Sequence, residues 1–206
     1  MQLQTAIAVE GYSSRLEDRA EVLPVPGAVV IVVADGAGGR AGGAEAADAV
    51  VRAVREAVAE GCRRAWHLVL RDADAVVLKD PKAGETTAVV LTADQEGILG
   101  ASVGDSGAWL ITPTGYTDLT SNQVRKPVIG SGGTPMPLWA KWPSGAPATL
   151  LVATDGLLKY ASPHQICRTA VAPNMEEAAN ALVDLVRLRS GALQDDVGLV
   201  LCRPIE

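Results

Sequence analysis

Two helical segments follow one another directly in this sequence, between two groups of short strands. Apolar residues recur at helical spacing over residues 50–58, and Gly61 can end that helix. The same spacing returns over residues 66–77, before Asp80-Pro81 ends the second helix. Because no strand separates the two helices, the segment does not form the strand–helix–strand unit of a parallel sheet.

Short apolar runs bounded by turn residues predict strands on both sides of these helices. The strands before the helices span residues 5–12, 20–27 and 28–35, and those after them span residues 87–92, 98–103, 108–112, 148–154 and 197–202. Links such as residues 93–97 are too short for a crossover, so we expect antiparallel neighbours. Ser162 before Pro163, and Asn174 before Glu177, predict the starts of two further helices.

Residues 131–147 contain four prolines and three glycines, and we predict a long irregular loop there. This loop carries Trp139, Lys141 and Trp142. It lies between the strands that lead to Asp105 and Asp155, so we expect its ends near those carboxylates and a role in choosing the substrate. An equally open alternative is that both tryptophans fold back as a small core beneath the loop.

Length and composition limit the classes of protein to consider. With 206 residues, 48% hydrophobic and 20% charged, the chain fits one folded domain spanning residues 1–206. Its net charge is −6 and no run of Lys and Arg occurs, so we expect no nucleic-acid partner. The longest apolar stretch, residues 28–34, is too short to span a membrane, and the first residues do not resemble an export signal. The three cysteines are widely spaced, and we expect a reducing, cytoplasmic location.

Carboxylates stand where several predicted strands begin or end. Asp35 and Asp155 each follow an apolar run, and the others are Glu17, Asp18, Asp105, Asp195 and Asp196. In an antiparallel sheet the end of one strand lies beside the start of its neighbour, so all of these side chains can gather on one rim. Carboxylates that lie close together repel unless cations neutralise them, and sites made of oxygen favour Mg(II) or Mn(II). The sequence therefore predicts a site for more than one such ion, although turn formation by Asp-Gly explains each carboxylate taken singly.

Six short motifs with these carboxylates occur in a distinctive order. They are Leu16-Glu17-Asp18, Asp35-Gly36-Ala37-Gly38-Gly39, Gly84-Glu85-Thr86-Thr87-Ala88, Val103-Gly104-Asp105-Ser106, Ala153-Thr154-Asp155-Gly156-Leu157 and Asp195-Asp196-Val197. In order and spacing, from about residue 10 to residue 201, the chain resembles a compact, bacterial-like member of the type-2C metal-dependent Ser/Thr protein phosphatases. The resemblance implies an α+β fold, a four-layer α-β-β-α sandwich of two antiparallel sheets flanked by helices. It also implies hydrolysis of phosphoserine and phosphothreonine in a protein, which could be a Ser/Thr kinase or the target of one.

The same resemblance implies roles for the matching residues. Asp35 would bridge two Mn(II) or Mg(II) ions, and Gly36 would add its backbone carbonyl. Glu17 would hold one of these ions, while Asp155 and Asp195 would hold the other.

Two further carboxylates and one basic residue complete the implied site. Asp18 would orient water, and Asp105 matches the position that helps to bind a third ion in bacterial members. A metal-activated water would attack phosphorus, so no protein nucleophile is needed. Many members carry a phosphate-binding Arg where this chain has Ser13, and Arg15 is the candidate substitute. Ala37 stands where some members have a His, which leaves protonation of the leaving group to water.

Three other interpretations compete with this one. Residues 104–107 read Gly-Asp-Ser-Gly, similar to the nucleophile segment of chymotrypsin-like proteases, but His67 and His164 fall in predicted helices. Residues 36–41 fit the G-x-G-x-x-A pattern of dinucleotide binders, but a second helix follows where a parallel strand is required. A catalytically silent phosphatase-like binding or regulatory module stays the main alternative, although all the metal-binding aspartates of the pattern are present.

Overall fold

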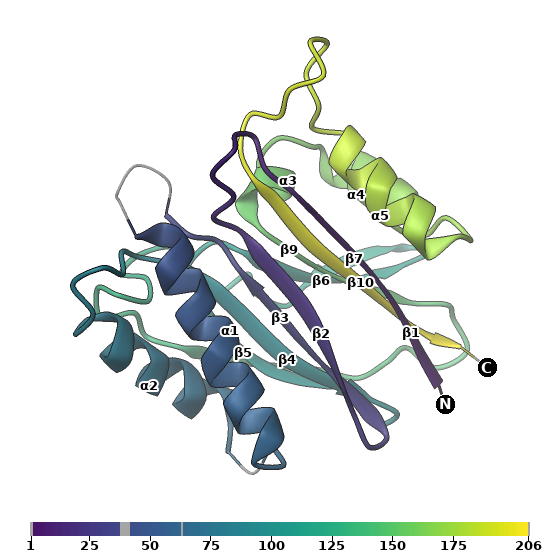
Figure 1. The fold of residues 1–206 in the computed structure, drawn as a ribbon. Helices are drawn as coiled ribbons and strands as arrows, with labels where there is room; N and C mark the ends of the chain where they lie inside the picture. Colours follow the sequence, from purple (N-terminus) through teal and green to yellow (C-terminus); the bar gives the residue numbers. More distant parts are fainter. Residues whose placement is uncertain (1, 38–41, 63, 206) are drawn as a thin grey trace.

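The computed structural model describes residues 2–37, 42–62 and 64–205. Two five-stranded antiparallel sheets pack face to face, and helices cover both outer faces (Figure 1). The architecture is therefore the α+β, four-layer sandwich that was expected. None of the helices in the described ranges is long and apolar enough to cross a membrane.

The two sheets are built from segments far apart in the chain. The first has the order β2-β3-β4-β5-β8, formed by Arg19–Val25, Ala28–Ala34, Ala88–Asp94, Ile98–Val103 and Met136–Ala140. The second has the order β1-β10-β9-β6-β7, formed by Gln2–Glu10, Val197–Ile205, Thr149–Ala153, Gly107–Thr112 and Gly115–Asp118.

Helices α1 (Gly43–Ala59) and α2 (Trp66–Val77) follow one another as predicted, and both cover the first sheet. Helices α3 (Asp155–Leu158), α4 (Pro163–Ala170) and α5 (Met175–Asp184) cover the second. The predicted caps of α4 and α5 are confirmed. Ser162 accepts a hydrogen bond from the backbone N–H of Gln165, and Asn174 accepts from those of Glu176 and Glu177.

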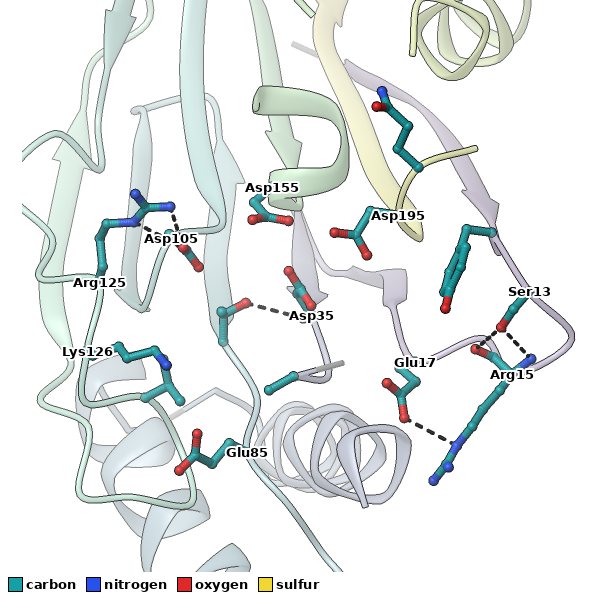
Figure 2. A pocket seen from close by; sticks show the side chains of 15 residues that line it. Ser13, Arg15, Glu17, Asp35, Glu85, Asp105, Arg125, Lys126, Asp155 and Asp195 are labelled. Atoms are coloured by element: carbon teal, nitrogen blue, oxygen red, sulfur yellow. Dashed lines mark hydrogen bonds and ion pairs between the residues drawn. The ribbon is translucent and has the colours of Figure 1, made fainter. Parts of the chain in front are cut away.

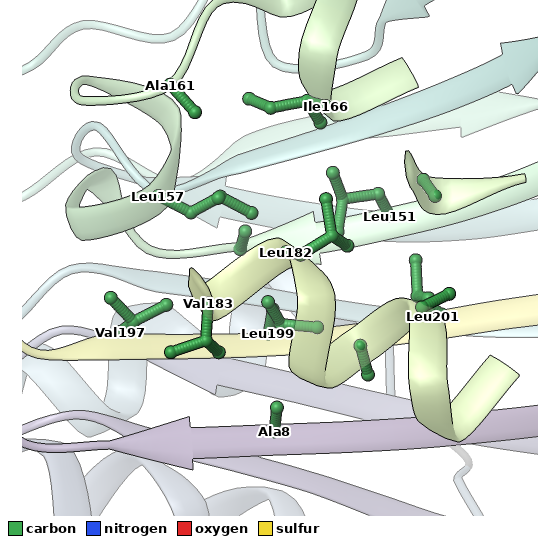
Figure 3. Packing of buried hydrophobic residues seen from close by; sticks show 14 of the residues in the cluster. Ala8, Leu151, Leu157, Ala161, Ile166, Leu182, Val183, Val197, Leu199 and Leu201 are labelled. Atoms are coloured by element: carbon green, nitrogen blue, oxygen red, sulfur yellow. The ribbon is translucent and has the colours of Figure 1, made fainter. Parts of the chain in front are cut away.

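The uninterrupted apolar run of β3 follows from its burial on both faces. Val30 and Val32 pack beneath α1 and α2, whereas Ile31 and Val33 face the second sheet. Within the second sheet the alternation is similar, and Figure 3 shows the face of β10 that packs against α5. One apolar layer thus lies between the two sheets, and one lies between each sheet and its helices. These layers fix how the sheets stack, and thereby which strand ends share a rim.

The prediction of an irregular loop over residues 131–147 is wrong for the central part of this segment. Residues 136–140 form β8, an edge strand paired with β5. An edge strand tolerates Pro137, because its outer side needs no partner for the missing N–H. The short strand β7 and the single turn of α3 were also not predicted.

The register of β8 places the tryptophans of this segment away from Asp105. Met136 pairs with Ser102 near the end of β5 that leads to Asp105, whereas Ala140 pairs with Ile98 at the opposite end. Trp139 is 71% exposed and, like Trp142, lies toward that opposite end. The Trp142 indole N–H donates to the backbone carbonyl of Asp94 at 2.7 Å, so Trp142 folds back as the alternative expected.

Candidate functional site

Five of the seven carboxylates predicted to share a rim line one pocket of about 670 Å³ (Figure 2), whereas Asp18 and Asp196 are buried beside it and are not part of its lining. Its lining includes Glu17, Asp35, Asp105, Asp155 and Asp195, together with Arg15. They come from both sheets, at the ends of β3 and β5 in the first and beside β9 and β10 in the second. The rim is thus assembled by the stacking of the two sheets, with one set of strand ends from each.

Asp35 is held in place by the two threonines that precede β4. Its backbone N–H donates to the Thr87 hydroxyl at 3.2 Å, and its carbonyl accepts from the Thr87 N–H at 2.9 Å and from the Thr86 hydroxyl at 2.8 Å. The Thr87 hydroxyl also lies 2.6 Å from that of Ser106, which is buried. These contacts give Thr86 and Thr87 a positioning role that sequence reasoning did not assign.

Gly36 is required by the close approach of α1. A Cβ atom at this position would lie 2.5 Å from the carbonyl carbon of Gly43, the first residue of α1. The chain beyond Asp35 therefore passes directly against the helix start. Of the G-x-G-x-x-A pattern, residues 38–41 lie outside the described residues, and the antiparallel sheets exclude a dinucleotide-binding strand–helix–strand unit here.

Asp196, to which no separate role was assigned, holds the loop that carries Glu17. One of its carboxylate oxygens accepts the Tyr12 N–H at 2.8 Å, and the other accepts the Glu17 N–H at 2.6 Å. Asp18, next to Glu17, is only 2% exposed, and its Oδ2 has no hydrogen-bond partner. The loop before β2 that carries Glu17 and Asp18 is thus tied to Asp196, the residue that precedes β10 of the second sheet.

The electrostatics reflect the crowding of negative charge. Burial, and then the charges of Asp18, Asp155, Asp195 and Asp105, raise the pKa of Asp35 to about 9. Burial also raises the pKa of Asp18 to about 7, partly opposed by a hydrogen bond from Thr154.

Asp155 belongs to the same electrostatic cluster. Burial, followed by the charges of Asp105 and Asp195, raises its pKa, while Lys159 and Arg125 oppose the rise. Asp35, Asp18, Asp155, Asp195 and Asp105 therefore lie close enough to influence one another.

Two arginines engage the outermost carboxylates of the pocket. Arg15 lies 3.3 Å from Glu17, and Arg125 lies 2.9 Å from Asp105 (Figure 2). Lys126 lines the same pocket. Sequence reasoning proposed Arg15 but missed Arg125, because residues 119–130 show no periodicity that places them at the rim.

The residues that line the pocket offer the donor atoms that a divalent metal ion prefers. The donor set consists of carboxylate oxygens, and Asp18 contributes a buried oxygen with no partner, as a hard cation site requires. In the described part of the chain, however, no three Asp, Glu, His or Cys side chains converge closely enough to hold one ion as they stand. The residue types therefore fit the ions, while the side chains are spread apart.

The geometry disagrees with a serine protease. Ser106 is buried and hydrogen bonded to Thr87, whereas His67 lies in α2 and His164 in α4. Among the described residues that line the pocket, neither histidine is included. A nucleophile with an adjacent imidazole base is therefore not assembled at residues 104–107.

Comparison with known proteins identifies relatives of this architecture. A family model described as Protein phosphatase 2C matches residues 12–187. The structure of a bacterial serine phosphatase is 19% identical, with a TM-score of 0.82 over 98% of each chain. That of the serine/threonine phosphatase Stp1 from Staphylococcus aureus is 17% identical, with a TM-score of 0.82 over 100% of this chain and 96% of Stp1.

A third solved structure carries metal. It is the catalytic domain of the serine threonine protein phosphatase PstP in complex with 2 manganese ions, 19% identical, with a TM-score of 0.76 over 99% of each chain. At these identities the likeness of the three structures shows the fold. No sequence among the curated proteins compared matches this chain.

Proposed function

Since this chain belongs to the protein phosphatase 2C family, we propose that it is a metal-dependent phosphatase that hydrolyses phosphoserine and phosphothreonine in proteins. The observation that carries this proposal is a pocket into which both sheets direct carboxylates. We assign the activity to residues 1–206 as one catalytic domain, acting in the cytoplasm. The substrate is a phosphorylated protein, either a Ser/Thr kinase or its target.

Two Mn(II) or Mg(II) ions would be held by the carboxylates of the rim, and the manganese ions of the PstP structure support this assignment. Asp35 would serve both ions and Gly36 would add its backbone carbonyl, while Glu17 would hold one ion and Asp155 and Asp195 the other. Asp105 would hold a third, weaker ion. When bound, the ions supply an activated water and offset the negative charge of the phosphoryl group.

The protein's own residues position these groups and the substrate. Thr86 and Thr87 hold the backbone of Asp35, so its carboxylate keeps a fixed place between the sheets. Asp18 offers its unpartnered Oδ2 as a buried acceptor for water. Arg15 takes the phosphate-binding role for which Ser13 is too short, and it must exchange its contact with Glu17 for one with the substrate.

Purified protein assayed with phosphoserine and phosphothreonine peptides and an aryl phosphate tests the proposal. With Mn(II), wild type should hydrolyse all three, and Asp155→Asn should lower turnover by at least about 100-fold, because it loses a charged ligand. Asp72→Asn is the matched control, since Asp72 forms exposed ion pairs with Arg64 and Arg71 outside the pocket. That variant should retain wild-type turnover, and the melting temperatures should show that both variants fold.

Two results would contradict the proposal in different ways. Equal turnover by wild type in excess EDTA would exclude the metal-dependent mechanism. Binding of Mn(II) with no turnover of any phosphate ester would favour the alternative, a catalytically silent binding module.

A further inference from the structure

Arg125 neutralises Asp105 at the mouth of the pocket. Its Nε and Nη2 donate to the same oxygen, Oδ2 of Asp105, at 3.1 and 2.9 Å. The Arg125 side chain is 74% exposed, whereas that of Asp105 is 29% exposed. An ion pair this open to water contributes little to stability, so the arginine can leave its partner at small cost.

The backbone on both sides of Arg125 is held firmly. On one side, the Gln123 N–H donates to the Thr120 carbonyl at 2.8 Å, and the Gln123 side chain accepts from the Ser102 hydroxyl at 2.8 Å. On the other, Ile129 and Thr86 exchange two backbone hydrogen bonds of 3.0 Å. Residues 124–127 are therefore presented beside the pocket on a fixed base, and only the side chain of Arg125 has to move for it to change partners.

A divalent ion and Arg125 compete for Asp105. Both are cations that use the lone pairs of the same carboxylate, and a guanidinium held at Oδ2 repels a divalent ion brought to the same group. Binding of an ion at Asp105 therefore favours release of Arg125. The released guanidinium lies in a pocket that also holds Asp35 and Asp155, so it stays at the rim where a phosphate would bind.

The pocket has few other positive charges to offer a phosphate. Its basic lining residues among those described are Arg15, Arg125 and Lys126, and Arg15 is paired with Glu17. Guanidinium presents several N–H groups in one plane and binds two phosphate oxygens together, which an ammonium group does not. Arg125 is thus the residue on this side of the pocket best suited to a phosphate monoester.

We propose that Arg125 exchanges partners: it pairs with Asp105 in the free protein, leaves when a divalent ion binds Asp105, and then binds the phosphate of the substrate. This inference rests on the proposed phosphatase function, because it assigns a substrate contact within the same site. The exchange couples the outer ion to the substrate, since each ion bound at Asp105 frees one arginine for phosphate.

Calorimetric titration of chelator-treated protein with Mn(II) tests the first half of the exchange. Arg125→Ala should tighten the weakest Mn(II) site by about fivefold, because the competing cation is gone. Asp105→Asn should lose the same site, which identifies it. Arg55→Ala is the control, since Arg55 is a similarly exposed arginine paired with Glu21 outside the pocket, and its isotherm should match wild type.

Binding of inorganic phosphate in saturating Mg(II), also followed by calorimetry, tests the second half. Arg125→Ala should weaken phosphate binding by about tenfold. The phosphate affinity of Arg125→Lys should lie between those of Arg125→Ala and wild type, because lysine keeps only the charge. With a phosphopeptide, KM should rise by a similar factor while kcat changes little.

The inference is overturned if the Mn(II) isotherms of Arg125→Ala and wild type superimpose, or if phosphate binds both equally well. Neither calorimetric measurement requires turnover. A protein that shows both shifts but hydrolyses no phosphate ester would therefore support the exchange and contradict the proposed function, so the two failures are distinguishable.

Discussion

At Asp35 and Asp18 the fold concentrates negative charge that it does not neutralise with its own side chains. The pKa of Asp35 is raised to about 9 and that of Asp18 to about 7, in both cases chiefly by burial. A carboxyl group whose pKa is higher in the folded state than in the unfolded state stabilises the fold. This stabilisation is fully present below the unfolded-state pKa of about 4. That contribution is lost as the pH rises through the folded pKa.

The metal-free protein should accordingly become less stable between pH 5 and pH 9. We expect the free energy of unfolding, measured with urea in excess EDTA, to fall steadily over this range, by up to about 1.4 kcal/mol per pH unit for each carboxyl group that is protonated only in the folded state. Asp18→Asn removes one of the two titrating groups and should flatten the profile. A wild-type profile with no slope between pH 5 and pH 9 would contradict the buried, repelling carboxylates.

Which residues of the site could be predicted depended on where their partners lie in the sequence. The carboxylates could be predicted because each ends or begins a strand, and antiparallel pairing brings such ends together. The contacts of Asp196 could not, because its partners Tyr12 and Glu17 lie at the other end of the chain. Arg125 could not for the same reason, since only the folded chain brings it to Asp105.

At the scale of elements, Asp74 of α2 anchors the segment that follows Arg125. It is a buried carboxylate whose Oδ1 accepts the N–H groups of Gly130 at 2.8 Å and Gly132 at 3.2 Å. Together with the pairing of Ile129 and Thr86, these bonds tie residues 128–133 to a rigid helix.

Asp74→Ala should therefore destabilise the protein by about 2–4 kcal/mol, because two backbone donors lose a charged acceptor. Asp74→Asn keeps an oxygen for the same N–H groups and should cost less. Urea unfolding of the three proteins measures both effects. Equal stability of Asp74→Ala and wild type would show that the turn is held without this carboxylate.

The elements that could be predicted are those with a local signal. Helices α4 and α5 begin where the capping residues Ser162 and Asn174 indicate, because a cap is formed within one turn. Strand β8 carries no comparable signal, since Pro137 argues locally against a strand and pairing with β5 supplies the support. The single turn of α3 is too short to show a helical period.

At the scale of the whole molecule, the rim joins the two sheets at one end of the sandwich. Asp35 and Asp105 follow strands of the first sheet, whereas Asp155 and Asp195 adjoin strands of the second. Between the sheets the apolar layer that contains Ile31 is closely packed, but the rim sets like charges from both sheets against each other. A cation shared by the rim would convert this repulsion into a link between the sheets.

Mn(II) should therefore stabilise the entire fold and not only the site. Binding to the folded state alone adds about 2.7 kcal/mol when the free ion is at 100 times its Kd. For a chain of 206 residues this corresponds to a rise in Tm of about 5–10 °C. The rise should be larger at pH 8 than at pH 5.5, because fewer protons then compete with the ion for Asp35. Asp195→Asn should reduce it, since this ligand belongs to the second sheet, and calorimetric scans with Mn(II) or EDTA measure both effects. Identical melting curves for wild type under the two conditions would mean that the carboxylates of the two sheets do not share an ion.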